Sequence, residues 1–174
     1  LSNLLYKAKN GRVLPDNDER YSYFSIASLA TLPHLFWKPD VIICNDWQNA
    51  TVPMIYNQVY RSREFYEDIK TVLIVHNFDE HCTYNRSVYD KIGVSIPKKI
   101  AGDKVNCYEA AADDVDLIIS LDSPSNNITK KLLDLPLVKS NKKKLISIKI
   151  EDGEDPSFDN TALKINDELA KHFA

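Results

Sequence analysis

The stretch from Trp37 to Pro53 holds the feature that most limits the fold of this chain. Inside it, Val41–Cys44 is a continuous apolar run. Such a run is typical of a parallel strand that is covered on both faces. Pro39 ends whatever element precedes the run, because proline interrupts a helix. We therefore predict a buried parallel strand at Val41–Cys44.

The rest of the chain alternates short apolar runs with helical spacing of apolar residues, which is the pattern of repeated βα units. The further predicted strands are Thr71–Val75, Asp116–Leu121 and Lys144–Ile150. The predicted helices are Asp18–Phe36, Gln48–Tyr60 with an extension towards Ile69, Lys104–Val115, Ser123–Leu135 and Asp159–Phe173. The predicted fold class is α/β, a Rossmann-like three-layer parallel sheet.

Local signals place the starts of two of these helices. Asp16 or Asp18 can accept backbone N–H bonds at the start of the first helix. Ser123 followed by Pro124 puts a capping hydroxyl before a proline at the first helical position. The first helix is expected to cover the sheet with a broad apolar face made of Phe24, Ala27, Leu29, Ala30 and Leu32.

Length and composition are those of one ordinary globular domain. The chain has 174 residues, of which 44% are hydrophobic and 27% are charged. The net charge of −3 argues against a surface for nucleic acid. The one basic run, Lys142–Lys144, comes just before an apolar run and is interpreted as a solvated loop.

The sequence shows no targeting or membrane segment, so we predict a cytoplasmic protein. No stretch approaches the roughly 20 apolar residues of a membrane span, and the N-terminus lacks a charged-then-apolar signal. The three cysteines, Cys44, Cys82 and Cys107, are odd in number and widely spaced, which favours reduced thiols. Cys44 is expected to be core packing.

Polar residues follow the first two predicted strands. Asn45 and Asp46 come after the first strand, and His76 and Asn77 come after the second. The carboxyl ends of parallel strands meet at one edge of the sheet, where open α/β sheets bind ligands. Two structural alternatives remain open: Asp46 caps a helix that begins near Trp47, or His76 bonds a backbone carbonyl.

Other candidate residues favour structural roles on the sequence alone. Trp37 and Trp47 are expected in the core or in a cleft wall more often than as sugar platforms. His76, His81 and Cys82 lack a second pair of ligands at a familiar spacing, so no metal site is predicted. Ser123 is expected to be a cap and not a nucleophile. The four glycines form neither a P-loop nor a GxGxxG fingerprint.

Four blocks of the chain together resemble the bacterial glycogen synthase and plant starch synthase family. The first is WKPDVIICNDWQNATVP, residues 37–53, and the second is DNDERYSYFS, residues 16–25. The third is IKTVLIVHN, residues 69–77, and the fourth starts as DKVNCYEAAA at residue 103 and runs to Ser123-Pro124. They occur in the family's order, which makes the assignment far stronger than any one block.

The resemblance implies a fold, an activity and a set of site residues. The fold would be that of the N-terminal domain of a GT-B glycosyltransferase. The complete family transfers glucose from ADP-glucose or UDP-glucose to an α-1,4-glucan with retention, and needs neither a metal nor another cofactor. By the same resemblance His76 contacts the donor sugar and Asp46 lines the same cleft, as catalytic residues. Asn45, Trp47 and Asn77 are the expected substrate-binding residues.

The chain also departs from the family pattern in three ways. The family's Lys-x-Gly-Gly-Leu loop, which holds the donor diphosphate, has no counterpart. The turn after His76 and Asn77 carries Asp79 and Glu80 in place of a Gln and Gly, and extra negative charge would repel a diphosphate. The second, nucleotide-binding domain is absent, so residues 1–174 are expected to form a single, partial domain that does not catalyse transfer alone.

Two non-catalytic readings remain beside the transferase. Trp47, Asp79 and Glu80 favour a protein that binds or regulates glucan and has lost transfer. The other alternative is a structural subunit. In that case a protein partner would cover the face where the second domain would lie. The segment Leu1–Pro15 has no capped or periodic start, and we expect that it begins in the middle of a larger domain.

Overall fold

The computed structural model describes residues 6–151 and 158–173. Within this part of the chain, four parallel strands form one sheet in the order β1-β2-β5-β6. Their bounds are Val41–Asn45 for β1, Lys70–Val75 for β2, Leu117–Asp122 for β5 and Leu145–Lys149 for β6. All four predicted strands are confirmed to within a residue or two, and so is the α/β fold class.

Side chains of the central strands alternate between two hydrophobic clusters, one on each face of the sheet. On β2, Leu73 and Val75 belong to the larger cluster, whereas Val72 and Ile74 belong to the smaller one. This alternation follows from the two-residue period of a strand. Because both faces are covered, β2 is apolar from Val72 to Val75, as a central parallel strand requires.

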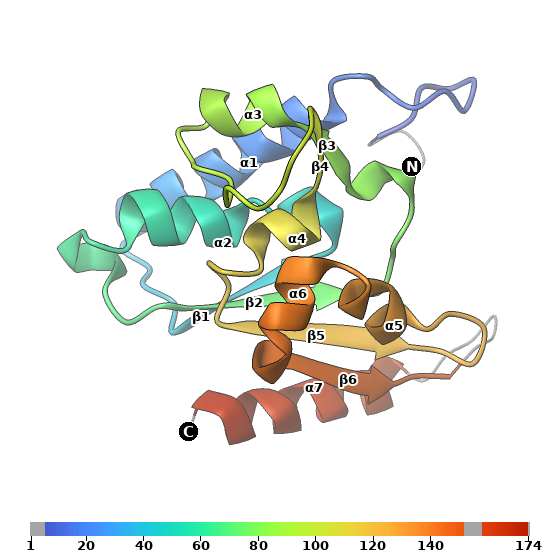
Figure 1. Cartoon of the computed structure of the whole chain (residues 1–174). Coiled ribbons are helices and arrows are strands. Elements are labelled where there is room, and N and C mark those ends of the chain that lie inside the picture. Colours follow the sequence, from blue (N-terminus) through green and yellow to red (C-terminus); the bar gives the residue numbers. More distant parts are fainter. Residues whose placement is uncertain (1–5, 152–157, 174) are drawn as a thin grey trace.

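Helices cover both faces of the sheet, which confirms the three-layer arrangement (Figure 1). The larger cluster includes residues of α1 (Asn17–Thr31), α2 (Val52–Ile55), α4 (Cys107–Ala111), α5 (Ile128–Leu133) and α6 (Pro136–Ser140). The opposite face is covered by α7 (Phe158–Phe173), through Ile165, Leu169 and Phe173. The predicted helix Asp159–Phe173 is therefore confirmed, both in its bounds and in its packing.

The first strand differs from the prediction because it lies at an edge of the sheet. β1 pairs with β2 alone among the described strands. Ile43 is 45% exposed, so this strand is not covered on both faces as the apolar run predicted. A groove of about 340 Å³ runs beside it, lined by Phe24, Trp37 and Ile43 among others. An apolar run by itself does not distinguish a central strand from an edge strand.

The buried face of α1 is more polar than its sequence suggested. Ser22, Ser25 and Leu29 are buried, whereas Phe24 is more than half exposed. The hydroxyl of Ser25 accepts a hydrogen bond from Thr51 at 3.0 Å, and such small polar residues let the two helices approach closely. The predicted apolar face was therefore correct at Leu29 and Leu32, where the side chains are buried, but wrong at Phe24 and Ala27, which are exposed.

The start of α1 is held by Asp18 and not by Asp16. Asp16 occupies the N-cap position without a side-chain capping bond. The carboxylate of Asp18 accepts a bond from the backbone N–H of Glu19 in the first turn, at 2.9 Å, as one of the two alternatives predicted. It also accepts bonds from the N–H and side-chain amide of Asn85 and so ties the first helix to a distant strand, which local sequence could not reveal.

The predicted helix at Gln48–Tyr60 is divided into three parts. A 3₁₀ turn at Trp47–Asn49 precedes α2, and a π-helical turn at Tyr56–Tyr60 follows it. Beyond these, a 3₁₀ turn at Glu64–Tyr66 replaces the predicted extension towards Ile69. Pro53 lies in the first turn of α2, where its missing N–H costs nothing.

The predicted helix at Lys104–Val115 begins three residues later than expected. Strand β4 (Lys104–Asn106) pairs antiparallel with β3 (Thr83–Asn85). Helix α3 (Arg86–Lys91) follows β3 in the chain. Asn106 then caps α4, because its side-chain oxygen accepts bonds from the N–H groups of Tyr108 and Glu109. This two-stranded sheet was missed because its strands are only three residues long.

Two further expectations near the C-terminal half are corrected. Ser123 and Pro124 do not start a helix: Asn127 caps α5 by accepting a bond from the N–H of Lys130. Lys144 is not a solvated loop residue, because its ammonium donates to the carbonyl groups of Ala112, Asp113 and Val115. Those carbonyls follow α4 or end it, where a cation is favourable.

The three cysteines are free and buried, and burial raises the pKa of the Cys44 thiol to about 12.

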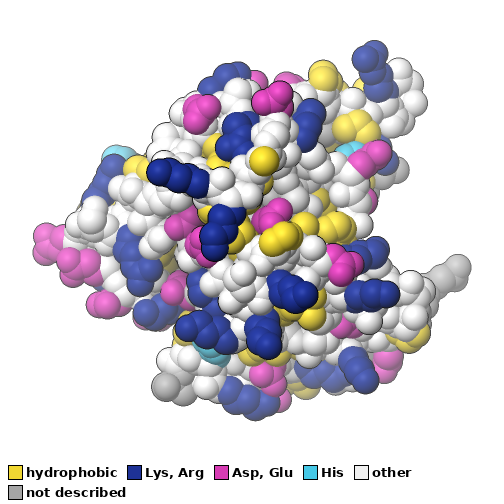
Figure 2. Space-filling view, in the orientation of Figure 1, with side chains coloured by type: hydrophobic (Ala, Val, Ile, Leu, Met, Phe, Trp, Pro, Cys, Tyr) yellow, Lys and Arg dark blue, Asp and Glu magenta, His cyan; other side chains and the backbone are white. Residues whose placement is uncertain are grey.

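Basic and acidic side chains are interspersed on the face shown in Figure 2. None of the helices in the described ranges is long and apolar enough to cross a membrane.

Candidate functional site

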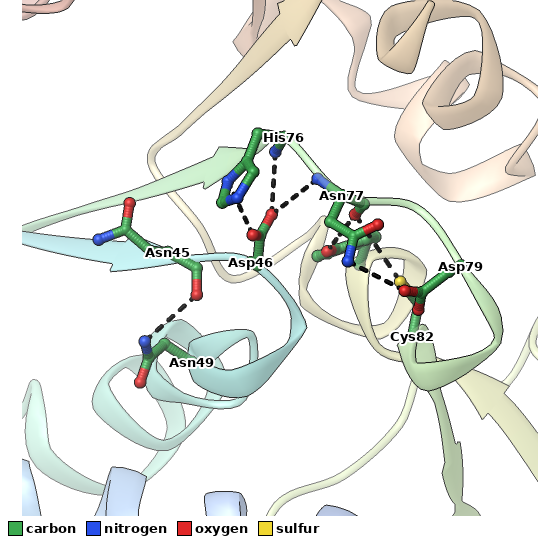
Figure 3. Close-up of polar contacts among 8 residues, drawn as sticks. Asn45, Asp46, Asn49, His76, Asn77, Asp79 and Cys82 are labelled. Atoms are coloured by element: carbon green, nitrogen blue, oxygen red, sulfur yellow. Dashed lines mark hydrogen bonds and ion pairs between the residues drawn. The ribbon is translucent and has the colours of Figure 1, made fainter. Parts of the chain in front are cut away.

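Asp46 lies directly after β1, in a backbone conformation that few non-glycine residues adopt. Its φ is 52° and its ψ is −166°. Its N–H donates to the carbonyl of Ile74 at 2.8 Å, which continues the pairing of β1 with β2 past the end of the strand. The side chain is 8% exposed and points towards the end of β2 (Figure 3).

The carboxylate of Asp46 takes three hydrogen bonds from the turn after β2. One oxygen, Oδ1, accepts from the backbone N–H of His76 at 2.9 Å and from that of Asn77 at 3.0 Å. The other, Oδ2, pairs with Nδ1 of the His76 imidazole at 2.7 Å. Asp46 makes no side-chain capping bond to the turn at Trp47–Asn49, so the capping alternative was wrong.

His76 has one ring nitrogen engaged and most of its ring open to solvent. The side chain is 58% exposed, although Nδ1 is held by Asp46. Its partner is thus a carboxylate and not a backbone carbonyl, which overturns that alternative. The hydrogen bond to Asp46 raises the pKa of His76 above its ordinary value of 6.5, burial acts in the opposite direction, and the negative charge of Asp46 adds to the rise.

Fixing Nδ1 decides what the other ring nitrogen can do. With the Nδ1 proton directed at Asp46, Nε2 is an acceptor in the neutral ring and a donor in the protonated ring. The raised pKa keeps the donor form present closer to neutral pH. The pair therefore presents an oriented, titratable polar group at the carboxyl edge of the sheet.

Asn77 is held on both its backbone and its side chain. Its carbonyl accepts a bond from the Tyr108 hydroxyl at 2.7 Å. Its side-chain amide donates to Asp79 Oδ2 at 2.9 Å, while Asp79 Oδ1 accepts from the N–H of His81 at 2.8 Å. Asp79, one of the two acids that depart from the family pattern, thus organises the turn in addition to bringing negative charge.

Asn45 lies at the same edge but does not join these contacts. Its carbonyl accepts a bond from the side-chain amide of Asn49 at 3.2 Å. Figure 3 shows the Asn45 side chain pointing away from Asp46. The structure therefore brings Asp46, His76 and Asn77 together and leaves Asn45 beside them.

Trp47, which follows Asp46 in the chain, lies in an aromatic cluster. Its side chain is 1% exposed, and its ring centroid lies 5.0 Å from that of Tyr21 and 5.5 Å from that of His81. This placement agrees with the core or cleft-wall interpretation. Trp37, by contrast, is 60% exposed and lies along the groove beside β1.

A pocket of about 330 Å³ is lined by Trp47, which follows Asp46 in the chain, and by Glu80 and His81 of the segment after β2. Asp46, His76 and Asn77 are not among its lining residues. Polar and aromatic side chains dominate its wall, among them Asn17, Asp18, Trp47, His81, Asn85 and Lys104. Planar polar groups together with aromatic side chains suit a ligand with many hydroxyl groups, because such a ligand needs both donors and acceptors.

Two residues with clear roles at this edge were missed from sequence. Tyr108 is one, and Asp122, at the end of β5, is the other. The Asp122 carboxylate accepts from the N–H of Thr129 at 2.8 Å and from Ser147 at 2.7 Å. Burial alone would raise its pKa, but these hydrogen bonds outweigh burial and lower it. The rule that selected Asp46, a polar residue just after an apolar run, would also have selected Asp122.

The sulfur and imidazole groups after β2 serve local packing. Cys82 Sγ lies 3.9 Å from the carbonyl of Asn77, and the His81 ring packs against Trp47. In residues 6–151 and 158–173, no group of three or more His, Cys, Asp or Glu side chains could hold a metal ion.

Comparison with known proteins extends these observations. A family model described as the starch synthase catalytic domain matches residues 2–123, well over half of the chain. The glycogen synthase of Chlorobium limicola is 36% identical over 115 residues, which cover 63% of this chain and 23% of that protein. The glycogen synthase of Vibrio cholerae serotype O1 is 44% identical over 70 residues, or 40% of this chain and 14% of that protein.

A solved structure gives the same result at the level of the fold. The catalytic domain of starch synthase IV from Arabidopsis thaliana, bound to ADP and acarbose, superposes with a TM-score of 0.65 at 25% identity. The match covers 79% of this chain and 30% of that one. The chain thus spans less than a third of each relative, and within that span it belongs to the starch synthase catalytic-domain family.

Proposed function

We propose that this chain forms the sugar-facing wall of a glycogen or starch synthase active site. The observation that carries the proposal is the His76–Asp46 pair, which presents an oriented imidazole at the carboxyl edge of the sheet. In open α/β sheets, ligands bind at this edge.

In the proposed whole enzyme, glucose passes from ADP-glucose or UDP-glucose to the non-reducing end of an α-1,4-glucan. The bond between C1 of glucose and the diphosphate oxygen breaks, and a bond forms from C1 to the acceptor oxygen on the same face of the sugar. The acceptor proton leaves with the nucleoside diphosphate. His76 would hydrogen-bond a hydroxyl of the donor sugar, with Asp46 fixing its orientation and Asn77 beside it.

The proposal assigns binding, and not complete catalysis, to this chain. Stabilising the leaving diphosphate requires positive charge or N–H dipoles placed at the phosphates. Asp79 and Glu80 place negative charge in the turn beside His76, which opposes phosphate binding there. We infer that a further part of the enzyme supplies the phosphate-binding groups. The solved Arabidopsis relative, bound to both ADP and acarbose, supports a site of this class.

A second candidate is a glucan-binding protein without transfer. The pocket beside Trp47 favours it, because Asn17, Asn85 and His81 in its wall can bond hydroxyl groups without any phosphate contact. Glu80 lines the same pocket and would disfavour a nucleotide there.

Parallel calorimetric titrations with ADP-glucose, ADP and a maltooligosaccharide test both candidates. If this chain forms the sugar-facing wall without the phosphate-binding groups, ADP-glucose should bind weakly through its glucose, and ADP should not bind. His76→Ala should abolish the ADP-glucose binding, while His34→Ala, which removes another exposed imidazole, should leave it intact. Glucan binding with no response to either nucleotide would favour the second candidate. Silence in all three titrations would contradict both candidates and favour a structural subunit that depends on a protein partner.

A further inference from the structure

The two peptide units that flank the Cα of Asn77 are each held by a side chain from another part of the chain. On one side, the N–H of Asn77 donates to Asp46 Oδ1 at 3.0 Å. On the other, its carbonyl accepts from the Tyr108 hydroxyl at 2.7 Å. With both units held, rotation about the two backbone bonds of Asn77 is restricted.

Tyr108 is itself firmly placed. It lies in α4, whose first N–H groups are capped by Asn106, and its side chain is fully buried. Its ring packs against Phe78, with the ring centroids 5.8 Å apart. Burial raises the pKa of the phenol, so the hydroxyl keeps its proton and can donate throughout the neutral range.

We propose that Tyr108 is a positioning residue whose hydroxyl fixes the Asn77 carbonyl and thereby holds His76 against Asp46. The role in sugar binding rests on the proposed function, whereas the geometric role does not. The link is short, because His76 and Asn77 are adjacent and the same Asp46 oxygen accepts both of their N–H groups. Movement of the Asn77 peptide would therefore disturb two of the three bonds of Asp46.

Loss of a positioning hydrogen bond can lower the reaction rate by more than the free energy of that one bond would suggest. A displacement of about 1 Å at a reacting group can cost about 100-fold in rate. The position of the turn after β2 is set by Asp46, directly after β1, and by Tyr108 from α4, so the site depends on segments that are far apart in the sequence.

The test compares two tyrosine-to-phenylalanine variants of equal chemistry. Tyr108→Phe removes the hydroxyl and keeps the ring. Tyr66→Phe removes another buried hydroxyl that donates to a backbone carbonyl, that of Leu29 at 2.8 Å, away from the site. NMR titration of the His76 imidazole and hydrogen exchange of the His76 and Asn77 amides are measured in both.

In Tyr108→Phe the pKa of His76 should fall towards its ordinary value, and both amides should exchange at least about tenfold faster than in the wild type. Tyr66→Phe should change neither. Unchanged values in Tyr108→Phe, or equal changes in the two variants, would overturn the proposal. Because no ligand is involved, this readout is independent of the proposed function, which fails separately if the wild type binds neither nucleotide sugar nor glucan.

If Tyr108→Phe does not fold, the wild type provides the measurement. A Tyr108 hydroxyl proton that exchanges slowly and shows a nuclear Overhauser contact to the Asn77 backbone supports the bond on which the proposal depends. A hydroxyl proton that exchanges freely in the folded wild type would overturn it.

Discussion

His76 Nδ1 and Asp46 Oδ2 lie 2.7 Å apart, although the two residues are 30 positions apart in the sequence. The contact exists because β1 and β2 are neighbours in the sheet and each residue follows the end of its own strand. The same carboxylate also accepts the backbone N–H groups of His76 and Asn77. A single buried side chain thus determines both where the turn after β2 lies and how its imidazole is oriented.

Asp46→Asn should lower the pKa of His76 towards its ordinary value. The substitution keeps the shape of the side chain but removes the negative charge, and its amide places a donor where the imidazole N–H needs an acceptor. Stability should fall by about 1–3 kcal/mol, because a buried hydrogen bond to a charged group is lost. NMR titration and urea unfolding measure the two effects.

Asp40→Asn is the matched control, since Asp40 is exposed and precedes the same strand. It should change neither quantity appreciably. A His76 pKa that is the same in Asp46→Asn and in the wild type would show that the ion pair does not set it.

The His76–Asp46 pair should stabilise the fold more at acidic than at alkaline pH. The folded-state pKa of His76 is raised, so its contribution is fully present below the ordinary value of 6.5 and is lost as the pH rises through the folded value. Urea unfolding of the wild type and His76→Gln at about pH 5.5 and about pH 8.5 measures this. The free energy of unfolding of the wild type should exceed that of His76→Gln by more at the lower pH. The difference between the two pH values should be modest, because the His76 ring is more than half exposed.

His34→Gln, which changes an exposed imidazole before the other end of β1, controls for the loss of a histidine as such. The prediction is wrong if the difference between the wild type and His76→Gln is flat or larger at the higher pH.

Trp47→Ala should destabilise the fold by about 3–5 kcal/mol, because it empties a buried aromatic site in contact with Tyr21 and His81. Trp37→Ala removes the other tryptophan of the chain, which is 60% exposed, and should cost less than about 0.5 kcal/mol. Urea unfolding followed by circular dichroism compares the two. Equal losses would mean that Trp47 does not pack as a core residue.

Lys144→Met should lower stability by about 1 kcal/mol or more, since the ammonium donates to three carbonyls, at 2.8, 2.9 and 3.3 Å. Methionine keeps most of the apolar stem and removes the charge. Lys143→Met, at the exposed neighbouring position, should be nearly neutral in the same urea unfolding measurement. If the two variants unfold alike, the basic run is a solvated loop after all.

The sequence was sufficient for the four parallel strands and for the edge at which the site lies. Val41–Cys44 and Thr71–Val75 are continuous apolar runs, and a run of this length bounded by polar residues is a local signal. The positions of Asp46 and His76 follow from the ends of those runs. The resemblance of four short blocks to glycogen and starch synthases was confirmed by the match to the family over residues 2–123.

Partners of individual side chains could not be read in the same way. Asp46, Asp18 and Ser123 all carry groups that can cap a helix. From local sequence a cap was an open alternative for Asp46, one of two choices for Asp18, and the prediction for Ser123. In the structure Asp46 binds the turn after β2, Asp18 binds Asn85, and Ser123 lies in a turn before the helix that Asn127 caps. A carboxylate or hydroxyl bonds whichever donor the fold brings near it, and those donors come from 30 or 67 residues away.

What the sequence by itself determined was the class of fold, the order of the four parallel strands along the chain and the family, because apolar periodicity and short motifs are properties of neighbouring residues. Only the tertiary structure decided that β1 lies at an edge, that Asp46 orients His76, that Trp47 is buried whereas Trp37 is exposed, and that Tyr108 holds Asn77. Each of these depends on which strands and helices pack side by side, and that is a property of contacts between residues distant in sequence.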